Sequence, residues 1–162
     1  MPPSDDPSAD DARTHRAGEP GPRFGGRVEV ETLPVTRDFL PRKRLLEERG
    51  ELALIEDGMA IHHLGYFSLV RDKGCRGGHF HLKKTEHFYV VSGRLRLELA
   101  DPETGEHAEL TLGAGQRAVV HPGCAHRFRA EETAQVIEYY EGRYDRGDDH
   151  PHDFDSVGSP RG

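Results

Sequence analysis

Two histidines and a glutamate stand close together near the centre of the sequence. His79 and His81 are separated by one residue, and Glu86 stands five positions after the second histidine. Because side chains at i and i+2 of a β-strand project from the same face, both imidazoles should point the same way if this segment is extended. A further imidazole, His126, follows the glycine-bounded segment 115–123. Three imidazoles and one carboxylate are enough to hold a transition metal and to leave coordination positions open.

This donor set restricts the metal only partly. The imidazoles must be neutral and the Glu86 carboxylate ionised to offer lone pairs. Three nitrogens and one oxygen are borderline in softness, so we expect one divalent transition metal, with zinc, iron, manganese and nickel all admissible. The alternative is that His79 and His81 are merely a pair of surface histidines. The presence of Glu86 and His126 at suitable places favours the metal site.

The same residues resemble the two sequence motifs of the cupin superfamily. The positions that match the family pattern are His79, His81, Glu86 and Gly93 in the first motif and Gly115, Gly123 and His126 in the second. Three positions depart from it: Gly74 is one place too close to the histidines, His121 replaces a proline, and Ala130 replaces an asparagine. The departures leave the four ligand positions intact, and the resemblance covers roughly residues 64–140.

The resemblance implies an all-β fold, a double-stranded β-helix (jelly-roll) barrel with a metal near one mouth. Some cupins have lost the metal and use the histidines as acid–base groups. The lead-in Arg76-Gly77-Gly78 is also similar to that of sugar-nucleotide-modifying cupins, including ketoisomerases. This shorter resemblance favours a sugar-modifying or natural-product cupin.

The strand patterns of the sequence independently indicate an all-β domain. In segment 94–100, leucines alternate strictly with charged residues, which is typical of a half-buried strand. Short apolar or alternating segments bounded by turn residues are predicted as strands: 28–33, 52–56, 64–70, 86–91, 94–100, 107–112, 117–121, 126–130 and 135–140. One short helix is expected at 43–49, ended by Gly50. Many short strands with glycine turns indicate a sandwich or barrel.

Composition divides the chain into three parts. Hydrophobic residues make up only 34% of the 162 residues, and the shortage lies at the two ends. Residues 1–26 are rich in Pro, Gly, Asp and Arg, so we expect a disordered N-terminal tail. Residues 27–141 are expected to form the cupin barrel as a single domain, and residues 142–162 an irregular C-terminal tail.

Charge and hydropathy exclude several classes of partner. A net charge of −7 disfavours nucleic-acid binding, which needs a positive face. No apolar run approaches the length of a membrane span, and the first residues lack the apolar segment of a secretory signal. Two cysteines, Cys75 and Cys124, do not indicate a disulfide framework, and inert thiols are the default. We therefore expect a cytoplasmic protein without nucleic-acid or membrane partners.

Catalysis at the predicted metal site would also need a proton donor or acceptor within hydrogen-bond reach. The candidates for a catalytic proton donor or acceptor are His121, Tyr66, Glu138 and Tyr140. Each of them also has an ordinary reading, as a solvated turn histidine or as a barrel residue. Arg76, Lys83 and Lys84 flank the ligands and are either a basic rim for an anionic substrate or simply solvated. Five further histidines have no spacing that suggests ligation and are expected to be solvated: His62, His63, His107, His150 and His152.

The favoured function is metal-dependent isomerisation, epimerisation or cyclisation of a small oxygenated metabolite, because an open metal position can polarise a carbonyl. The alternatives are an iron-dependent dioxygenase, a zinc cupin acting on amine intermediates in natural-product biosynthesis, and a non-catalytic small-molecule-binding cupin. A homodimer is expected, with segment 28–33 adding to a partner's sheet.

Overall fold

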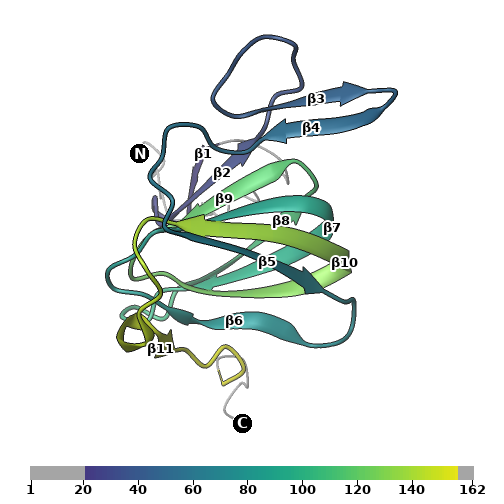
Figure 1. Ribbon diagram of the computed structural model, residues 1–162. Helices are drawn as coiled ribbons and strands as arrows, with labels where there is room; N and C mark the ends of the chain where they lie inside the picture. The colour runs from purple at the N-terminus through teal and green to yellow at the C-terminus, as the bar shows by residue number, and fades with distance from the viewer. Residues whose placement is uncertain (1–20, 157–162) are drawn as a thin grey trace, which may run out of the picture.

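The computed structural model of the protein describes residues 21–156, and in this part of the chain the strands form two layers folded over one another (Figure 1). A single 3₁₀ turn, η1 (Arg146–Asp148), is the one helical element of these residues. The strands are β1 (Gly21–Arg23), β2 (Val28–Thr32), β3 (Lys43–Glu47), β4 (Gly50–Leu54), β5 (His63–Leu69), β6 (Cys75–Phe80), β7 (Glu86–Ala100), β8 (His107–Gly113), β9 (Gln116–Val120), β10 (Ala125–Tyr140) and β11 (His150–Pro151). No helix among the described residues is long and apolar enough to cross a membrane.

Two long strands, β7 and β10, organise the sheet. They pair with each other, and each changes its outer partner halfway along. β7 pairs first with β9 and then with β8, and β10 pairs first with β6 and then with β5. Because the outer partners differ, the antiparallel sheet closes over itself, and the all-β jelly roll expected from the sequence is confirmed.

The interior between the layers is filled by every second residue of the strands, as the alternation of apolar and charged residues in segment 94–100 predicts for that segment. Leu95, Leu97 and Leu99 are at most 1% exposed, and Phe88 and Phe128 pack against one another with ring centroids 4.8 Å apart. Burying each such side chain contributes about 1.5–3 kcal/mol relative to leaving it exposed. This apolar core is continuous with the residues below the histidine cluster, so it fixes the strands that carry the cluster.

Two glycines permit close approaches that the site requires. Gly93, the glycine that ends the first motif, has φ +84°, and a Cβ there would overlap the carbonyl of Thr133 on β10. Gly77 has φ +86°, and a Cβ there would lie 2.7 Å from the carbonyl oxygen of His126. Only glycine adopts this conformation freely. Gly77 therefore lets β6 lie directly against the strand that carries His126.

The prediction of a helix at 43–49 is wrong. This segment is strand β3, which forms a hairpin with β4, and Leu45 lies opposite Leu52. An isolated helix shorter than about 12–15 residues is marginal in water, whereas Gly50, with φ +130°, supplies a tight turn. The hairpin extends away from the two layers (Figure 1).

Secondary structure is found on both sides of residues 27–141. Strand β1 precedes this range, and η1 and β11 lie within the C-terminal segment that was expected to be irregular. β11 pairs with β6, so it is held to the barrel. Residues 1–20, which form most of the expected N-terminal tail, lie outside the described residues.

Strand β2 is paired on both sides over most of its length. It pairs with β1 on one side and with β9 on the other. Its residues Val28 and Val30 are buried in the core. Both edges of residues 28–30 are therefore paired within the chain, whereas Glu31 and Thr32 pair with β9 alone, so this pairing lends no support to the expected addition of segment 28–33 to a partner's sheet.

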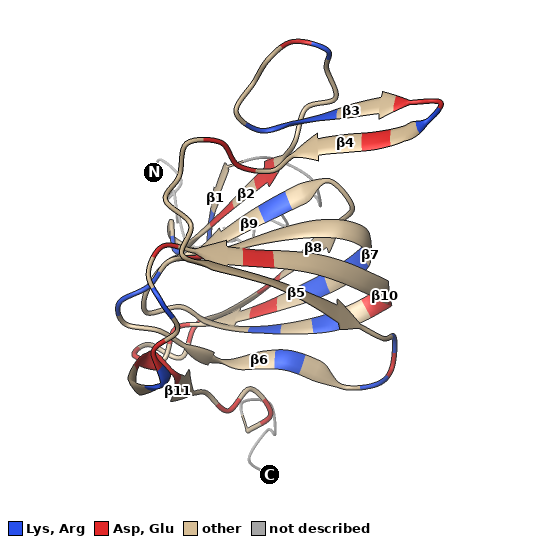
Figure 2. Cartoon of the chain, in the orientation of Figure 1, with Lys and Arg blue, Asp and Glu red and all other residues tan. Residues whose placement is uncertain are grey.

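Charged residues are interspersed along the strands in the view of Figure 2. One group of polar side chains, around Arg117, is buried on the outer face of the sheet. Arg117 on β9 contacts four acceptors: Tyr139 Oη at 2.7 Å, His87 Nδ1 at 2.8 Å, Glu56 Oε2 at 3.1 Å and Glu31 Oε2 at 3.3 Å. The His87 ring stacks on Tyr139 at 4.9 Å. These contacts link Glu56, in the loop after β4, to β9, to β10 and to β7, the strand that begins with Glu86.

Candidate active site

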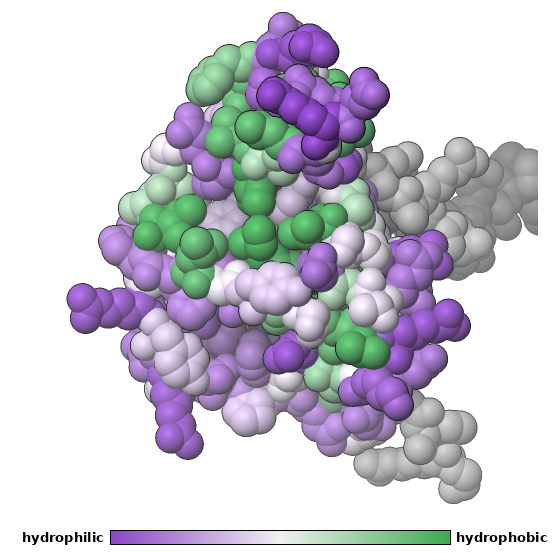
Figure 3. Space-filling model, turned by 45° about the vertical axis from the view of Figure 1, so that its right-hand side comes forward, coloured by the Kyte–Doolittle hydropathy of each residue, from purple (hydrophilic) through white to green (hydrophobic). Residues whose placement is uncertain are grey.

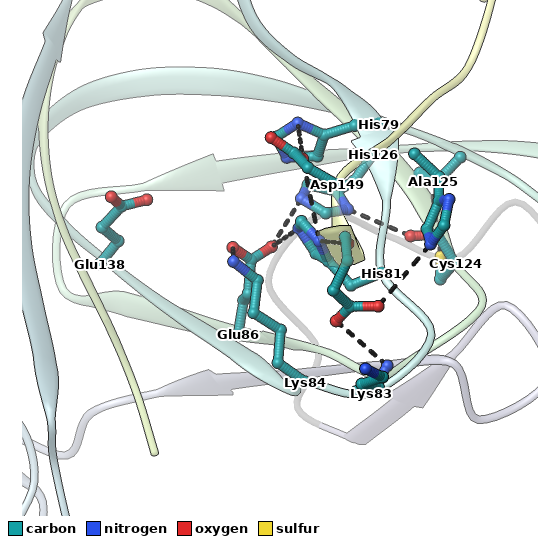
Figure 4. A network of polar contacts seen from close by, with 12 residues as sticks. His79, His81, Lys83, Lys84, Glu86, Cys124, Ala125, His126, Glu138 and Asp149 are labelled. Atoms are coloured by element: carbon teal, nitrogen blue, oxygen red, sulfur yellow. Dashed lines mark hydrogen bonds and ion pairs between the residues drawn. The ribbon is translucent and has the colours of Figure 1, made fainter. Parts of the chain in front are cut away.

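The structure brings the four predicted ligands together. His79 is on β6, His81 follows its end, Glu86 begins β7, and His126 is the second residue of β10. Their candidate ligand atoms all lie within 4.8 Å of one another. His126 and His79 are register partners on neighbouring strands, which explains how residues far apart in sequence meet. Figure 4 shows the rings and the carboxylate pointing toward one another.

The hydrogen bonds of two of these rings determine where their lone pairs point. Nδ1 of His81 lies 2.7 Å from the carbonyl of Asp148, and Nδ1 of His126 lies 3.1 Å from the carbonyl of Cys124. A carbonyl only accepts, so each Nδ1 carries the proton, and each neutral ring has its lone pair on Nε2. Both Nε2 atoms face the same oxygen, Glu86 Oε2, at 3.2 Å and 2.8 Å.

Three electron-rich atoms thus converge on a buried point. Neither His81 Nε2 nor Glu86 Oε2 has a hydrogen-bond partner, although both are buried. Burial alone would raise the pKa of Glu86, but the rings of His126 and His81 hold it well below its usual range. Burial alone would lower the pKa of His81, but the Glu86 carboxylate raises it, and the net shift is upward. The site therefore requires positive charge, which a divalent ion or added protons can supply, and the donor set fits the ion.

A pair of aspartates in the C-terminal segment supports the rings, and sequence reasoning missed both. Asp149 Oδ1 lies 3.0 Å from Nδ1 of His79. The buried Asp148 carboxylate accepts hydrogen bonds from the backbone N–H groups of Leu82 and Lys83. Such carboxylate–histidine contacts orient ligands in metal sites. No sequence signal locates them, because the segment reaches the site only through the pairing of β11 with β6.

Lys84 lies inside the site, whereas Lys83 lies outside it. The side chain of Lys84 is 13% exposed, with Nζ 3.4 Å from Glu86 Oε1 and 4.2 Å from the centre of the Tyr140 ring. Burial opposes its charge, but Glu86 and Tyr140 raise its pKa, so it is a cation. Burial likewise raises the pKa of Tyr140. Lys83 is 77% exposed, near Asp145. Of the predicted basic rim, Lys84 and Arg76 line the cavity, whereas Lys83 does not.

The cluster forms one wall of a cavity of about 290 Å³. Of the predicted catalytic residues, Glu138 and Tyr140 line this cavity, and Tyr66 lies at its edge, 60% exposed. His121 does not line it. His121 directly follows β9, which pairs with β2. Its Nε2 therefore lies 3.1 Å from Oε2 of Glu29 on β2, away from the cavity.

The five histidines expected to be solvated divide into two groups. His62 and His107 are exposed, as expected. His63 lines the cavity, and His150 and His152 are half-buried on the C-terminal segment. For His63 the signal was available in the sequence, since it precedes a predicted strand by one residue. For the other two, burial depends on the unpredicted docking of that segment.

The two thiols have different environments. Cys124 is 1% exposed, and burial raises its pKa to about 12, whereas Cys75 is exposed. Because the thiolate is the reactive form, we expect only Cys75 to react with Ellman's reagent in the native protein and both thiols to react in denaturant. Rapid reaction of both thiols without denaturant, or of neither, would contradict the structure.

The chain matches the family described as polysaccharide biosynthesis C-terminal domain over residues 47–144, whereas no curated protein matches it. Among solved structures, the sugar 3,4-ketoisomerase QdtA from Thermoanaerobacterium thermosaccharolyticum is 17% identical, with 75% of this chain and 85% of that chain covered and a TM-score of 0.58. The WlaRB TDP-quinovose 3,4-ketoisomerase from Campylobacter jejuni is 13% identical, with 77% and 92% covered and a TM-score of 0.59.

A further solved structure of the same fold is dTDP-4-dehydrorhamnose 3,5-epimerase from Sulfolobus tokodaii. It is 16% identical, with 85% of this chain and 84% of that chain covered and a TM-score of 0.62. At these identities the likeness shows the fold, which is the cupin fold expected from the sequence motifs. Since the family match covers more than half of its residues, the chain belongs to the polysaccharide biosynthesis C-terminal domain family.

Proposed function

We propose that this protein is a sugar-modifying cupin that isomerises or epimerises a keto sugar carried on a nucleotide. The solved proteins that share its fold are named as 3,4-ketoisomerases and 3,5-epimerases of TDP-linked sugars. The observation that carries the proposal is the convergence of His81, His126 and Glu86 in the wall of a cavity that also holds Lys84 and Tyr140. Such a cavity combines groups that stabilise negative charge with groups that transfer protons.

The size of the cavity suits the sugar part of such a substrate. About 290 Å³ is at the lower limit of ligand pockets, which are roughly 300–1,000 Å³. A sugar ring fits this space, and the nucleotide would then lie at the rim. Arg76 lines the rim, with its guanidinium 5.5 Å from the centre of the Phe67 ring, where it can contact a diphosphate.

We propose that His79, His81, Glu86 and His126 hold one divalent transition metal, with zinc, iron, manganese and nickel all compatible with the donors. When bound, the ion would polarise the carbonyl of the substrate. The protein's own side chains would orient a ligand and supply further positive charge. Asp149 orients His79, and the Lys84 ammonium provides positive charge where an enolate oxygen develops.

The test is proton exchange at the substrate. Protein incubated in D₂O with TDP-4-keto-6-deoxyglucose, the ligand of one structural neighbour, is expected to incorporate deuterium at the carbon beside the carbonyl and to form an isomer, equally under air and under nitrogen. NMR spectroscopy follows both changes. Turnover only in air would indicate a dioxygenase, and binding without exchange across a set of TDP-linked keto sugars would indicate a binding protein. Either result would overturn the proposal.

We also propose that the protein forms a homodimer through the exposed apolar surface beside the hairpin rather than through β2. Figure 3 shows hydrophobic side chains gathered over one face of the molecule. Leu64 on β5 is 72% exposed, Leu52 on β4 is 56% exposed, and Phe39 is 77% exposed. Exposed apolar patches of this kind mark interaction sites.

Light scattering after size exclusion is expected to give about twice the chain mass of 18.1 kDa. The Leu64→Glu variant is expected to elute as a monomer, because it places a charge within the apolar contact. Leu82→Glu is a matched control, since Leu82 is also exposed but lies beside the C-terminal segment. A monomeric wild-type protein would contradict the proposal.

A further inference from the structure

His63, the first residue of β5, is built into the wall of the cavity. Its ring stacks on that of Tyr140 at 4.2 Å with an angle of 7° between the planes. Its Nε2 lies 3.5 Å from Glu138 Oε1. Its side chain is 29% exposed, so one face is packed while the ring still reaches the cavity.

The pairing of β5 with β10 creates this arrangement. His63 lies opposite Tyr140, and Gly65 lies opposite Glu138. A Cβ at position 65 would lie 2.9 Å from Glu138 Oε1 and 3.0 Å from its Cγ. Glycine at this position therefore leaves room for the carboxylate to lie across β5 beside the histidine. The ring is thus held by a stacked phenol on one side and oriented by a carboxylate on the other.

The cavity consequently has two polar ends. Figure 4 shows Glu138 well apart from the group formed by His79, His81, Glu86 and His126. If these four side chains bind an ion, each donates a lone pair to it, and none of them is then free to accept a proton. Proton transfer must in that case use other residues of the cavity wall.

We propose that His63, oriented by Glu138, is the catalytic residue that accepts a proton from the substrate carbon beside the carbonyl. This inference rests on the proposed function. In the reaction the C–H bond breaks, its electron pair forms the double bond of an enolate, and His63 takes the proton on Nδ1, because its Nε2–H faces Glu138 Oε1. For epimerisation a proton returns to the same carbon from the other face. For ketoisomerisation it returns to the former carbonyl carbon, and the proton of the neighbouring hydroxyl moves to the enolate oxygen, so that the hydroxyl-bearing carbon becomes the new carbonyl and the former carbonyl becomes a hydroxyl.

The first test compares His63→Gln with wild type in the deuterium-exchange assay with TDP-4-keto-6-deoxyglucose. Loss of a positioned acid–base group should slow both exchange and product formation by about 10²–10⁴-fold. Glu138→Gln should slow them less, since it removes only the orienting partner. His62→Gln is a matched control, because this adjacent histidine is exposed and does not line the cavity. Metal content and thermal midpoint should be unchanged in all three variants.

Exchange by His63→Gln at the wild-type rate would overturn the assignment while leaving the proposed function intact. A loss of exchange accompanied by a loss of metal or a lowered thermal midpoint would also overturn it, because the role would then be structural. Absence of exchange by the wild-type protein would overturn the proposed function and this assignment with it.

The second test does not depend on turnover. Diethyl pyrocarbonate modifies accessible histidines, and mass spectrometry locates the modified residues. Saturation with TDP-4-keto-6-deoxyglucose is expected to protect His63, which would contact the sugar, and to leave the exposed His107 on β8 unprotected. Equal modification of His63 with and without a ligand that binds would show that it does not touch the substrate and would overturn the assignment.

Discussion

Glu86→Gln is expected to lose the bound metal and to slow turnover by more than the ~10–100-fold that follows loss of a residue merely supporting a metal site. The carboxylate is the single anionic donor among the four clustered side chains, and its Oε2 lies within 3.2 Å of the Nε2 atoms of His81 and His126. An amide of the same shape offers a weaker donor and no negative charge. Metal analysis of the purified variant and the deuterium-exchange assay measure the two effects.

The control for this variant is Glu109→Gln. Glu109 is an exposed residue on β8, opposite Glu98, and it does not line the cavity. The substitution removes the same charge from the chain and should leave metal content and exchange unchanged. If Glu86→Gln retained a full complement of metal, the carboxylate would not be a ligand, and the proposed site would be wrong in its one acidic member.

Arg117→Met is expected to lower the free energy of unfolding by about 1–3 kcal/mol, because it leaves the buried Tyr139 oxygen without its donor and leaves Arg42 as the remaining cationic partner of Glu56. The Arg117 side chain is 10% exposed, and its guanidinium contacts Glu56, itself 9% exposed, as well as Glu31 and the Tyr139 hydroxyl. Urea denaturation at neutral pH measures the loss.

Arg94→Met provides the comparison for Arg117→Met. Arg94 pairs with Glu131 and Glu132 on the surface and is 50% exposed, so its removal should cost only about 0–1 kcal/mol. Equal, small losses in both arginine variants would show that the buried group contributes no more than a surface pair.

The metal cluster and the core could be predicted because their signals are local or periodic. The spacing of His79 and His81 fixes their common face, and the alternating leucines of 94–100 fix the inward face of β7. His126 joins them through a register that only the family resemblance could anticipate.

The remaining parts of the site depend on contacts that leave no pattern in the sequence. Asp149 reaches His79 only because β11 docks on β6. The two adjacent lysines look alike in the sequence, and only the fold shows that Lys84 turns inward toward Glu86. His121 was placed near the ligands by its position in the motif, but strand pairing directs it toward β2. Sequence distance from a ligand is therefore a poor guide to distance in space.

The most direct test of the account is the metal content of protein purified without added metal, followed by anomalous scattering from its crystals. We predict about one divalent transition-metal ion per chain, bound between His79, His81, Glu86 and His126. Removal of the ion with a chelator should abolish deuterium exchange, and its return should restore it. A metal-free protein that exchanges the substrate proton at an undiminished rate would contradict the account.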